Sequence, residues 1–549
     1  MASYTIGLDY GSNSVRAIIV DTTDGRVCGS NVYAYSHGDM GVIGDVKDPN
    51  VARQHPAYYL EGLELTVRGA MLEAGVEPAK VVGIGVDATA STPLPVDAQG
   101  QALALTDAFK EDPDAMAWLW KDHSSLVEAN EITAKAAALR PEYLAKCGGT
   151  YSSEWYWSKI LHCARVAPKV YAAAHDWIEL PDWIPFVLTG QLSRCLCAAG
   201  HKGLYCPDWG GYADADFLAA VDPCLVRIRE GLPDQAYHIG HTAGGLNAEW
   251  AGKLGLPEGI PVAMGIIDAH AGAVGSGIQP GTMVKIMGTS TCDIAVASLE
   301  NKLPDIPGIC GVAHESVLPS CYGLEAGQAA VGDIFNWLVH KIEPGQGMSH
   351  QDLGDRAAML QPGESGLLAL DWNNGNRSTL TDPELTGMIL GLTLHTTPAE
   401  TFRALVEATA FGARVIIERY KEYGVPIERV INCGGISIKS PMTMQIYADV
   451  LGCPMEVSAN EQSCALGAAM AGAVVAGIYP DFGTAAQAMT SVSETVYEPI
   501  ASNQEIYGRL FRLYRRLHDL FGTKDYAENQ FDLMKELIAI RSEVRCQAD

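Results

Sequence analysis

The chain has 549 residues, which is too long for one ordinary hydrophobic core and predicts at least two domains. Hydrophobic residues make up 48% and charged residues 19%, a composition typical of a soluble globular protein. The formal net charge of −27 repels nucleic acid and anionic lipid, so we expect neither a nucleic-acid nor a membrane partner.

The first 34 residues predict three strands. TIGLDY and VRAIIVD are joined by the polar turn GSNS, and TDG then leads into a third, short strand. Residues 81–87, VVGIGVD, predict a buried parallel strand, and residues 180–190 predict a helix that ends at Gly190. The Pro/Gly-rich stretch 254–265 predicts a domain boundary, with a first domain over 1–256.

The second half repeats the plan of the first. GTMVKIMGTSTCDIAVAS is again strand, turn and strand, and the turn 288–291 corresponds to the turn 11–14. Residues 428–440, ERVINCGGISIKS, parallel residues 80–91, and a helix should follow Ser440. The repeat predicts two similar α/β domains that face each other across a cleft, the second over 257–500.

The last part of the chain, 501–549, predicts a helical extension. Ser502 and Glu505 have the spacing of a capping box. An apolar stripe follows, which either packs on its own domain or forms the seam of a homodimer.

The cysteines and the apolar runs bear on location. Fourteen cysteines are scattered, and the CxC pair Cys195 and Cys197 has no second pair at metal-ligand spacing. We therefore expect reduced thiols in a cytoplasmic protein without a signal peptide. The longest apolar run, 465–479, is short and rich in small residues, which favours a closely packed core helix over a membrane span.

The first candidate site is the segment from Asp9 to Arg16. Gly11 allows a tight turn, and the turn residues Ser12, Asn13 and Ser14 offer backbone N–H groups and short polar side chains that suit a phosphate. Asp9 ends a strand and could hold Mg²⁺ through water, while Arg16 could hold the turn or a phosphate. An ordinary hairpin with a polar turn is the alternative.

Two further turns carry glycine. Gly288, Thr289 and Ser290 form a turn like the first one, in the other half. Gly434 and Gly435 follow a strand and could let a flat ring approach the backbone, although the P-loop pattern is absent because Ile438 precedes Lys439. The polar-aromatic stretches 151–159 and 201–203 suit either the edge of a core or a sugar site.

Asp268 stands in the stretch GIIDAHAGAVGSG (265–277), among Gly, Ala, Ile and Val. Such a carboxylate is costly to bury without a partner. It could cap the helix that follows, or it could serve chemistry beside a closely approaching ligand. The glycines that follow match a dinucleotide-binding pattern only loosely.

Motifs across essentially the whole chain resemble one family. The chain is similar to the FGGY carbohydrate kinases of the actin, sugar-kinase and Hsp70 clan, and within them to the L-ribulose kinases. The resemblance rests on LDYGSNSVRA, VGIGVDATASTP, LWKDHSS, YSSEWYWSKILH, AGHKGLY, the Asp268 stretch, KIMGTSTCDI, GLEAGQAAVGD, ATAFGAR and GGISIKS.

This resemblance implies two ribonuclease H-like α/β domains that flank a cleft for ATP and sugar. It implies transfer of phosphate from MgATP to the terminal hydroxyl of L-ribulose, a step of L-arabinose breakdown, with Asp268 as the base. The sugar site would also contain Ala90, Lys202 and Glu325. With Gly11, Ser14, Arg16 and Gly288 from the turns, the nucleotide site would contain Ser12, Asn13, Thr289, Gly332, Asn336, Gly435 and Lys439, and Asp9 and Asp268 would lie at the metal.

Two positions depart from glycerol-type relatives. Lys439 often corresponds to Asn there, which bears on the adenine contacts. Ala90 and Ser91 correspond to Arg and Glu, and their shorter side chains leave room for a five-carbon ketose. A kinase for D-ribulose or xylulose, and an ATP-gated binding protein like actin or Hsp70, are the alternative functions.

Overall fold

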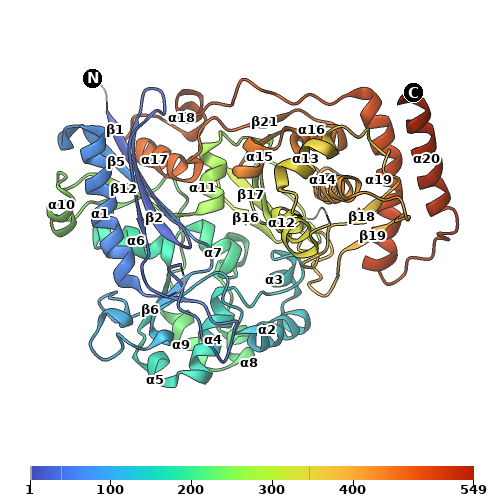
Figure 1. The fold of residues 1–549 in the computed structure, drawn as a ribbon. Coiled ribbons are helices and arrows are strands. Elements are labelled where there is room, and N and C mark those ends of the chain that lie inside the picture. Colours follow the sequence, from blue (N-terminus) through green and yellow to red (C-terminus); the bar gives the residue numbers. More distant parts are fainter. Residues whose placement is uncertain (1–2, 39, 345–346, 549) are drawn as a thin grey trace.

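A computed structural model describes residues 3–38, 40–344 and 347–548 (Figure 1). The chain forms two mixed sheets, one from each half, with helices packed on both. Within the described residues, no helix combines the length and apolar character needed to cross a membrane. All fourteen cysteines are free thiols.

The first sheet is built around the N-terminal hairpin. β1 and β2 are antiparallel, and β5 runs parallel to β1, as the sequence predicted. In spatial order the sheet contains β11 (Thr242–Gly245), β12 (Pro261–Ala263), β5 (Val81–Ala88), β1 (Tyr4–Tyr10), β2 (Ser14–Asp21) and β3 (Val27–Ala34), with β13 (Ile266–Ile267) also paired to β5.

The second sheet repeats this arrangement. β14 and β15 are antiparallel and β20 runs parallel to β14, which confirms the repeated plan. Its spatial order is β16 (Gly311–His314), β17 (Cys321–Ala326), β15 (Thr291–Ser298), β14 (Gly281–Met287), β20 (Ile427–Cys433) and β21 (Met455–Val457).

The division between the sheets falls later than the predicted boundary after residue 256. β12 and β13 follow that boundary but pair with β5 of the first sheet. The Pro/Gly-rich stretch 254–265 is therefore a crossing inside the first sheet, because backbone pairing carries the chain back to β5 before it leaves.

Two helices of small residues, packed on each other, join the first sheet to the second (Figure 1). α17 (Ser463–Val475) packs on β1, on β5 and on α11 (Asp268–Gly275). A Cβ at Gly7 would lie 1.9 Å from the carbonyl oxygen of Ala465, so the backbones touch and only glycine fits. The predicted close-packed core helix is confirmed.

A separate core lies between β5 and β11 in the sequence. It is rich in aromatic side chains, including Trp118, Trp157 and Trp177. α6 ends at Gly190, whose φ of 76° is left-handed, as predicted. The helices of this region are α2 (Leu126–Leu139), α3 (Pro141–Ala145), α4 (Tyr156–Val166), α5 (Pro168–Ala173), α6 (Leu180–Thr189), α7 (Leu196–Lys202), α8 (Ala215–Val221) and α9 (Cys224–Gly231).

Short paired strands complete this region and the second half. They are β4 (Arg53–Gln54) with β7 (Ala117–Trp118), β6 (Pro93–Val96) with β8 (Asp176–Glu179), β9 (Tyr205–Cys206) with β10 (Gly211–Tyr212), and β18 (Leu368–Leu370) with β19 (Met388–Leu390). The first half also contains α1 (Pro56–Ala74) and α10 (Ala248–Leu254).

Helices cover the second sheet. α16 begins after Ser440, whose hydroxyl accepts the Thr443 N–H, and ends at Gly452 with φ 70°, as predicted. The remaining helices of the second half are α12 (Gly332–Trp337), α13 (His350–Ala358), α14 (Pro398–Glu422), α15 (Gly435–Lys439), α18 (Phe482–Met489), α19 (Ala501–Gly522) and α20 (Leu533–Ala548).

The predicted capping box of the C-terminal helix is wrong. α19 begins at Ala501, one residue before Ser502, and no side-chain cap is formed at its N-cap position, Ile500. Instead Asp449 of α16 accepts the Ile500 N–H at 2.8 Å and the Asn503 amide at 2.8 Å. A carboxylate from another helix replaces the local cap because α19 packs on α16. The apolar stripe of α19 joins the core of the second half, as in the first of the two predicted alternatives.

Candidate active site

Three acidic residues lie at the carboxyl ends of three neighbouring strands of the first sheet. Asp9 near the end of β1 and Asp87 near the end of β5 are register partners, and Asp268 directly follows β13. Ligands of α/β proteins bind at the carboxyl ends of such strands. The sheet therefore gathers the predicted base and the predicted metal-binding acid at one edge.

Asp268 is the first residue of α11, one position after the N-cap. Its Oδ1 accepts the Ala269 N–H at 2.7 Å, so the carboxylate also serves the helix end. Burial and the negative charges of Asp9 and Glu325 raise its pKa to about 7, against the opposing effects of the Ala269 N–H and Lys202. A carboxylate with a pKa near neutrality is well suited to accept a proton from a hydroxyl.

Lys202 and Glu325 form a buried ion pair between the two halves. Lys202 Nζ, at the end of α7, lies 3.1 Å from Glu325 Oε2 and 3.2 Å from Oε1, on β17. Arg377 also donates to Glu325 Oε1, at 2.7 Å. Burial raises the pKa of Glu325, but Lys202 and Arg377 outweigh it, and the net pKa lies well below the usual range.

Ala90 lies on a loop whose backbone is bound by a buried lysine. Ser91, the next residue, has a left-handed φ of 51°. The buried Lys159 ammonium donates to three carbonyl oxygens, those of Ser91 (2.6 Å), Leu119 (2.7 Å) and Trp118 (3.2 Å). The geometry of the Ala90 loop thus depends on the polar-aromatic stretch 151–159, whose Trp155 ring also lies 5.5 Å from Lys202 Nζ.

The two glycine turns are alike, but their glycine N–H groups are used internally. The Gly11 N–H donates to Ser14 O and the Gly288 N–H donates to Ser290 O, both at 2.9 Å. The other N–H groups and hydroxyls of the turns are left for a ligand. Trp120 Nε1 donates to the Ser12 hydroxyl at 2.8 Å, and Arg16 lies 3.4 Å from Asp9.

A cavity of about 690 Å³ opens beside the second turn. Its size suits a nucleotide. Phe335, Ile436 and Met442 supply apolar surface, and His350 Nε2 donates to Asn336 Oδ1 at 2.8 Å. Six predicted nucleotide residues line it: Gly288, Thr289, Gly332, Asn336, Gly435 and Lys439. The predicted residues of the first turn, Gly11 to Ser14 and Arg16, belong to the first sheet and do not line this cavity.

The double glycine has two different roles. Gly434 has φ 98°, and a Cβ there would lie 2.4 Å from the carbonyl oxygen of Met287. Gly435 lines the cavity, and a Cβ there would have no atom within 4 Å. Gly434 therefore allows two backbones to touch, whereas Gly435 leaves space for a ligand.

Sequence reasoning missed Asp87 and Arg377. Asp87 is fully buried and its two carboxylate oxygens have no hydrogen-bond partner within the described residues. Burial and the nearby charge of Asp9 raise its pKa well above the usual range. The matching strand ends Asp9 and Asp87 could have revealed it, whereas nothing local in the sequence marks Arg377.

His201, His270 and Glu325 are the one group of potential metal ligands that lie within 4.8 Å of one another among the described residues. The buried His270 has its pKa lowered to about 4 and is therefore neutral. However, Lys202 and Arg377 already bring two positive charges to Glu325. This arrangement favours binding of hydroxyl groups over binding of a cation.

Comparison with known proteins decides the family. The sequence model of the N-terminal domain of the FGGY family of carbohydrate kinases matches residues 4–275, and that of the C-terminal domain matches residues 283–476. The chain belongs to the FGGY family of carbohydrate kinases. It is therefore an ATP-dependent sugar kinase, and the predicted family resemblance is confirmed.

Similar sequences and similar solved structures match almost the whole length of this FGGY kinase. A ribulokinase of Geobacillus thermodenitrificans is 42% identical over 97% of this chain and 96% of its own. A ribulokinase of Mycolicibacterium smegmatis is 40% identical over 98% and 96%. The crystal structure of a xylulose kinase from Rhodospirillum rubrum superposes with a TM-score of 0.79 at 25% identity, covering 94% of this chain and 98% of that one. The predicted fold class is confirmed.

Proposed function

We propose that this FGGY kinase phosphorylates L-ribulose at its terminal hydroxyl, giving L-ribulose 5-phosphate and ADP. The observation that carries the proposal is the match, near 40% identity and over nearly the full length, to proteins named ribulokinase. The structure supports it with a site where Asp268 lies near the ion pair of Lys202 and Glu325.

In the proposed reaction, Asp268 accepts the proton of the terminal hydroxyl. The hydroxyl oxygen attacks the γ-phosphorus of ATP, the bond to the β,γ-bridging oxygen breaks, and ADP leaves with that electron pair. Lys202 and Glu325 would orient other hydroxyls of the sugar. The glycine turns would hold the phosphates of ATP, and the 690 Å³ cavity would hold its adenine.

Mg²⁺ belongs to the proposal as the partner of ATP. The two unpartnered oxygens of Asp87, beside Asp9, are suited to the oxygen-rich, partly hydrated coordination that Mg²⁺ prefers. Asp9 and Asp87 would hold the ion or its water ligands, and Asp268 would lie near it. When bound, the ion neutralises phosphate charge.

The test is a panel of pentuloses and pentitols with purified protein and MgATP, followed through ADP release. The expected result is a kcat/KM for L-ribulose well above that for D-ribulose and xylulose, with the product identified by NMR as the 5-phosphate. Equal or higher kcat/KM for another pentulose would overturn the choice of sugar. Absence of sugar-stimulated ADP release would support the ATP-gated binding protein instead.

A kinase for xylulose is the second candidate. Two solved structures of xylulose kinases, from Rhodospirillum rubrum and Lactobacillus acidophilus, share the fold at 25% and 18% identity, below the 42% identity of a protein named ribulokinase. The same panel of sugars separates the two candidates.

A further inference from the structure

A buried chain of hydrogen bonds leads from α19 to the proposed sugar site. Tyr514 of α19 donates its hydroxyl to Asp371 Oδ1 at 2.8 Å. The other carboxylate oxygen of Asp371 accepts Gln328 Nε2 at 2.7 Å. Tyr514 lies beyond residue 476, where the matched family domain ends, whereas Gln328 is three residues after Glu325.

Gln328 has a single orientation because every group of its amide is used. Nε2 also donates to Thr409 O at 2.7 Å, and Oε1 accepts Lys285 Nζ at 3.0 Å. Its backbone N–H donates to the hydroxyl of Thr291, the residue that closes the second glycine turn. Gln328 therefore holds the segment 325–328 (the Glu325 segment) in one position relative to the second glycine turn.

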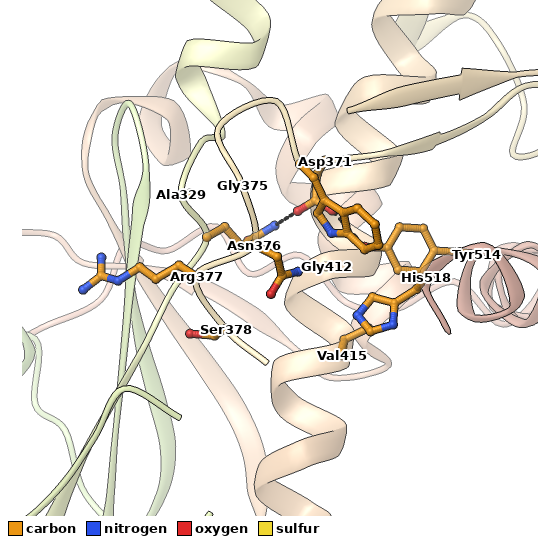
Figure 2. A pocket seen from close by; sticks show the side chains of 12 residues that line it. Ala329, Asp371, Gly375, Asn376, Arg377, Ser378, Gly412, Val415, Tyr514 and His518 are labelled. Carbon is orange, nitrogen blue, oxygen red and sulfur yellow. Dashed lines mark hydrogen bonds between the residues drawn. The ribbon is translucent and has the colours of Figure 1, made fainter. Parts of the chain in front are cut away.

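Asp371 also begins a loop that returns to the Glu325 segment. Figure 2 shows Asp371 beside Tyr514 at one end of residues 371–378 (the Arg377 loop), and Arg377 extending away from them. Ser378 Oγ accepts the Gly327 N–H at 3.2 Å, and Arg377 donates to Glu325 at 2.7 Å. The loop thus contacts the Glu325 segment at three points, and Tyr514 holds its beginning.

The packing around Asp371 leaves little freedom. A Cβ on Gly412 of α14 would lie 2.4 Å from Asp371 Oδ2 and 2.8 Å from Gln328 Nε2, so the helix backbone presses on this hydrogen bond. The hollow beside it measures about 10 Å³, which is room for roughly one water molecule. A shift of Tyr514 cannot be absorbed locally and would be passed to the loop.

We propose that α19 positions the sugar site, with Tyr514 acting through Asp371 and the Arg377 loop on Glu325. This inference rests on the proposed function, because Glu325 is taken to bind the sugar. Tyr514 touches neither substrate and is a positioning residue. Removing its hydroxyl should loosen Glu325, and with it the sugar, while the nucleotide cavity stays intact.

A second tyrosine of the same helix provides a matched control. Tyr507 is also fully buried, and its hydroxyl donates to a carboxylate, Glu407 Oε1, at 3.0 Å. Arg403 donates hydrogen bonds to both members of that pair, to Glu407 Oε1 and to the Tyr507 hydroxyl. None of these bonds reaches the Glu325 segment or the Arg377 loop. Tyr507→Phe and Tyr514→Phe each remove a tyrosine–carboxylate bond from the same helix. Tyr507→Phe also removes the bond that Arg403 donates to the Tyr507 hydroxyl, so its loss of stability should be at least as large.

The experiment compares both variants with wild type in sugar kinetics, ATP binding by calorimetry and thermal unfolding. Tyr514→Phe should raise the KM for L-ribulose by about fivefold, with the Kd for ATP within about twofold of wild type. Tyr507→Phe should lower Tm at least as much but leave the KM for sugar unchanged. Equal sugar KM values in the two variants would overturn the proposal.

Arg377→Met tests the other end of the loop without touching α19. It should raise the KM for sugar, and adding Tyr514→Phe should have little further effect, because both changes act through one loop. If the two substitutions raise the KM for sugar by fully additive amounts, the proposal is overturned. If Tyr514→Phe alone folds poorly, an unchanged KM for sugar in Arg377→Met overturns it. If wild type proves to use another sugar, the proposed substrate fails, and the same comparison is made with the sugar it uses.

Discussion

Replacing Asp268 by asparagine should stop catalysis and stabilise the protein. The substitution keeps the shape of the side chain and removes its charge. As the proposed base, Asp268 should contribute about 10²- to 10⁴-fold to kcat, so the variant should lose that much. The Kd for ATP should change little, because Asp268 does not line the nucleotide cavity.

The gain in stability follows from the raised pKa. In the unfolded chain an aspartate has a pKa near 3.8, whereas in the fold the pKa of Asp268 is about 7. The folded state therefore holds the proton more tightly, and ionisation destabilises the fold progressively as pH rises from about 4 through 7. Three pKa units correspond to a ceiling of roughly 4 kcal/mol, and partial exposure and rearrangement reduce the expected gain to about 1–3 kcal/mol.

The assay is thermal unfolding of wild type and variant at pH 5.5 and pH 8, together with kinetics. For a chain of this length, roughly 1 kcal/mol shifts Tm by about 1 °C if it unfolds as one unit. The variant should therefore melt about 1–3 °C higher at pH 8, with a smaller difference at pH 5.5. A lower Tm at pH 8 would refute the electrostatic argument, and more than a tenth of the wild-type kcat would refute the role as base.

Three other predictions concern the same cleft. kcat/KM for L-ribulose should fall below pH about 7, because Asp268 must be ionised to accept a proton, and a flat profile from pH 5.5 to 8.5 would contradict this. Gly11→Ala and Gly288→Ala should raise the KM for ATP more than that for sugar, because the added Cβ would crowd the N–H groups and hydroxyls that each turn offers to a phosphate. Within the protein the Cβ atoms would meet only Ser14 O at 3.5 Å and Ser290 O at 3.8 Å, so the turns themselves should stay folded. Equal effects on both substrates would point to plain hairpins. Ala90→Arg should lower kcat/KM for L-ribulose about 10²-fold or more while Ala90→Ser has a far smaller effect, and sugar-independent ATP hydrolysis serves as the control.

Local patterns in the sequence predicted the local structure well. The hairpin of β1 and β2, its counterpart in β14 and β15, and the parallel strand β5 all follow from apolar strands broken by short polar turns. The small residues of 465–479 predicted a helix that touches its neighbours closely, and α17 does so. These features depend on residues within a few positions of one another.

The grouping of the candidate site residues was predictable in part, through motifs, and their roles stay predictions. The six predicted residues of the nucleotide cavity come from three separate segments, and the structure brings them around one space. Lys202 and Glu325 are 123 positions apart and form one ion pair. Asp87 was missed because its importance comes from register with Asp9, a relation between two strands.

The amino-acid sequence alone determined the strand–turn–strand units, the close-packed helix and the family, because each can be recognised from short stretches of sequence. Only the tertiary structure decided which charges meet. Arg377 joins Lys202 at Glu325, Asp449 takes the place of the expected cap at α19, and Tyr514 reaches Asp371. The physical reason is that ion pairs and hydrogen bonds depend on distances of about 3 Å between groups far apart in the chain, which only folding sets.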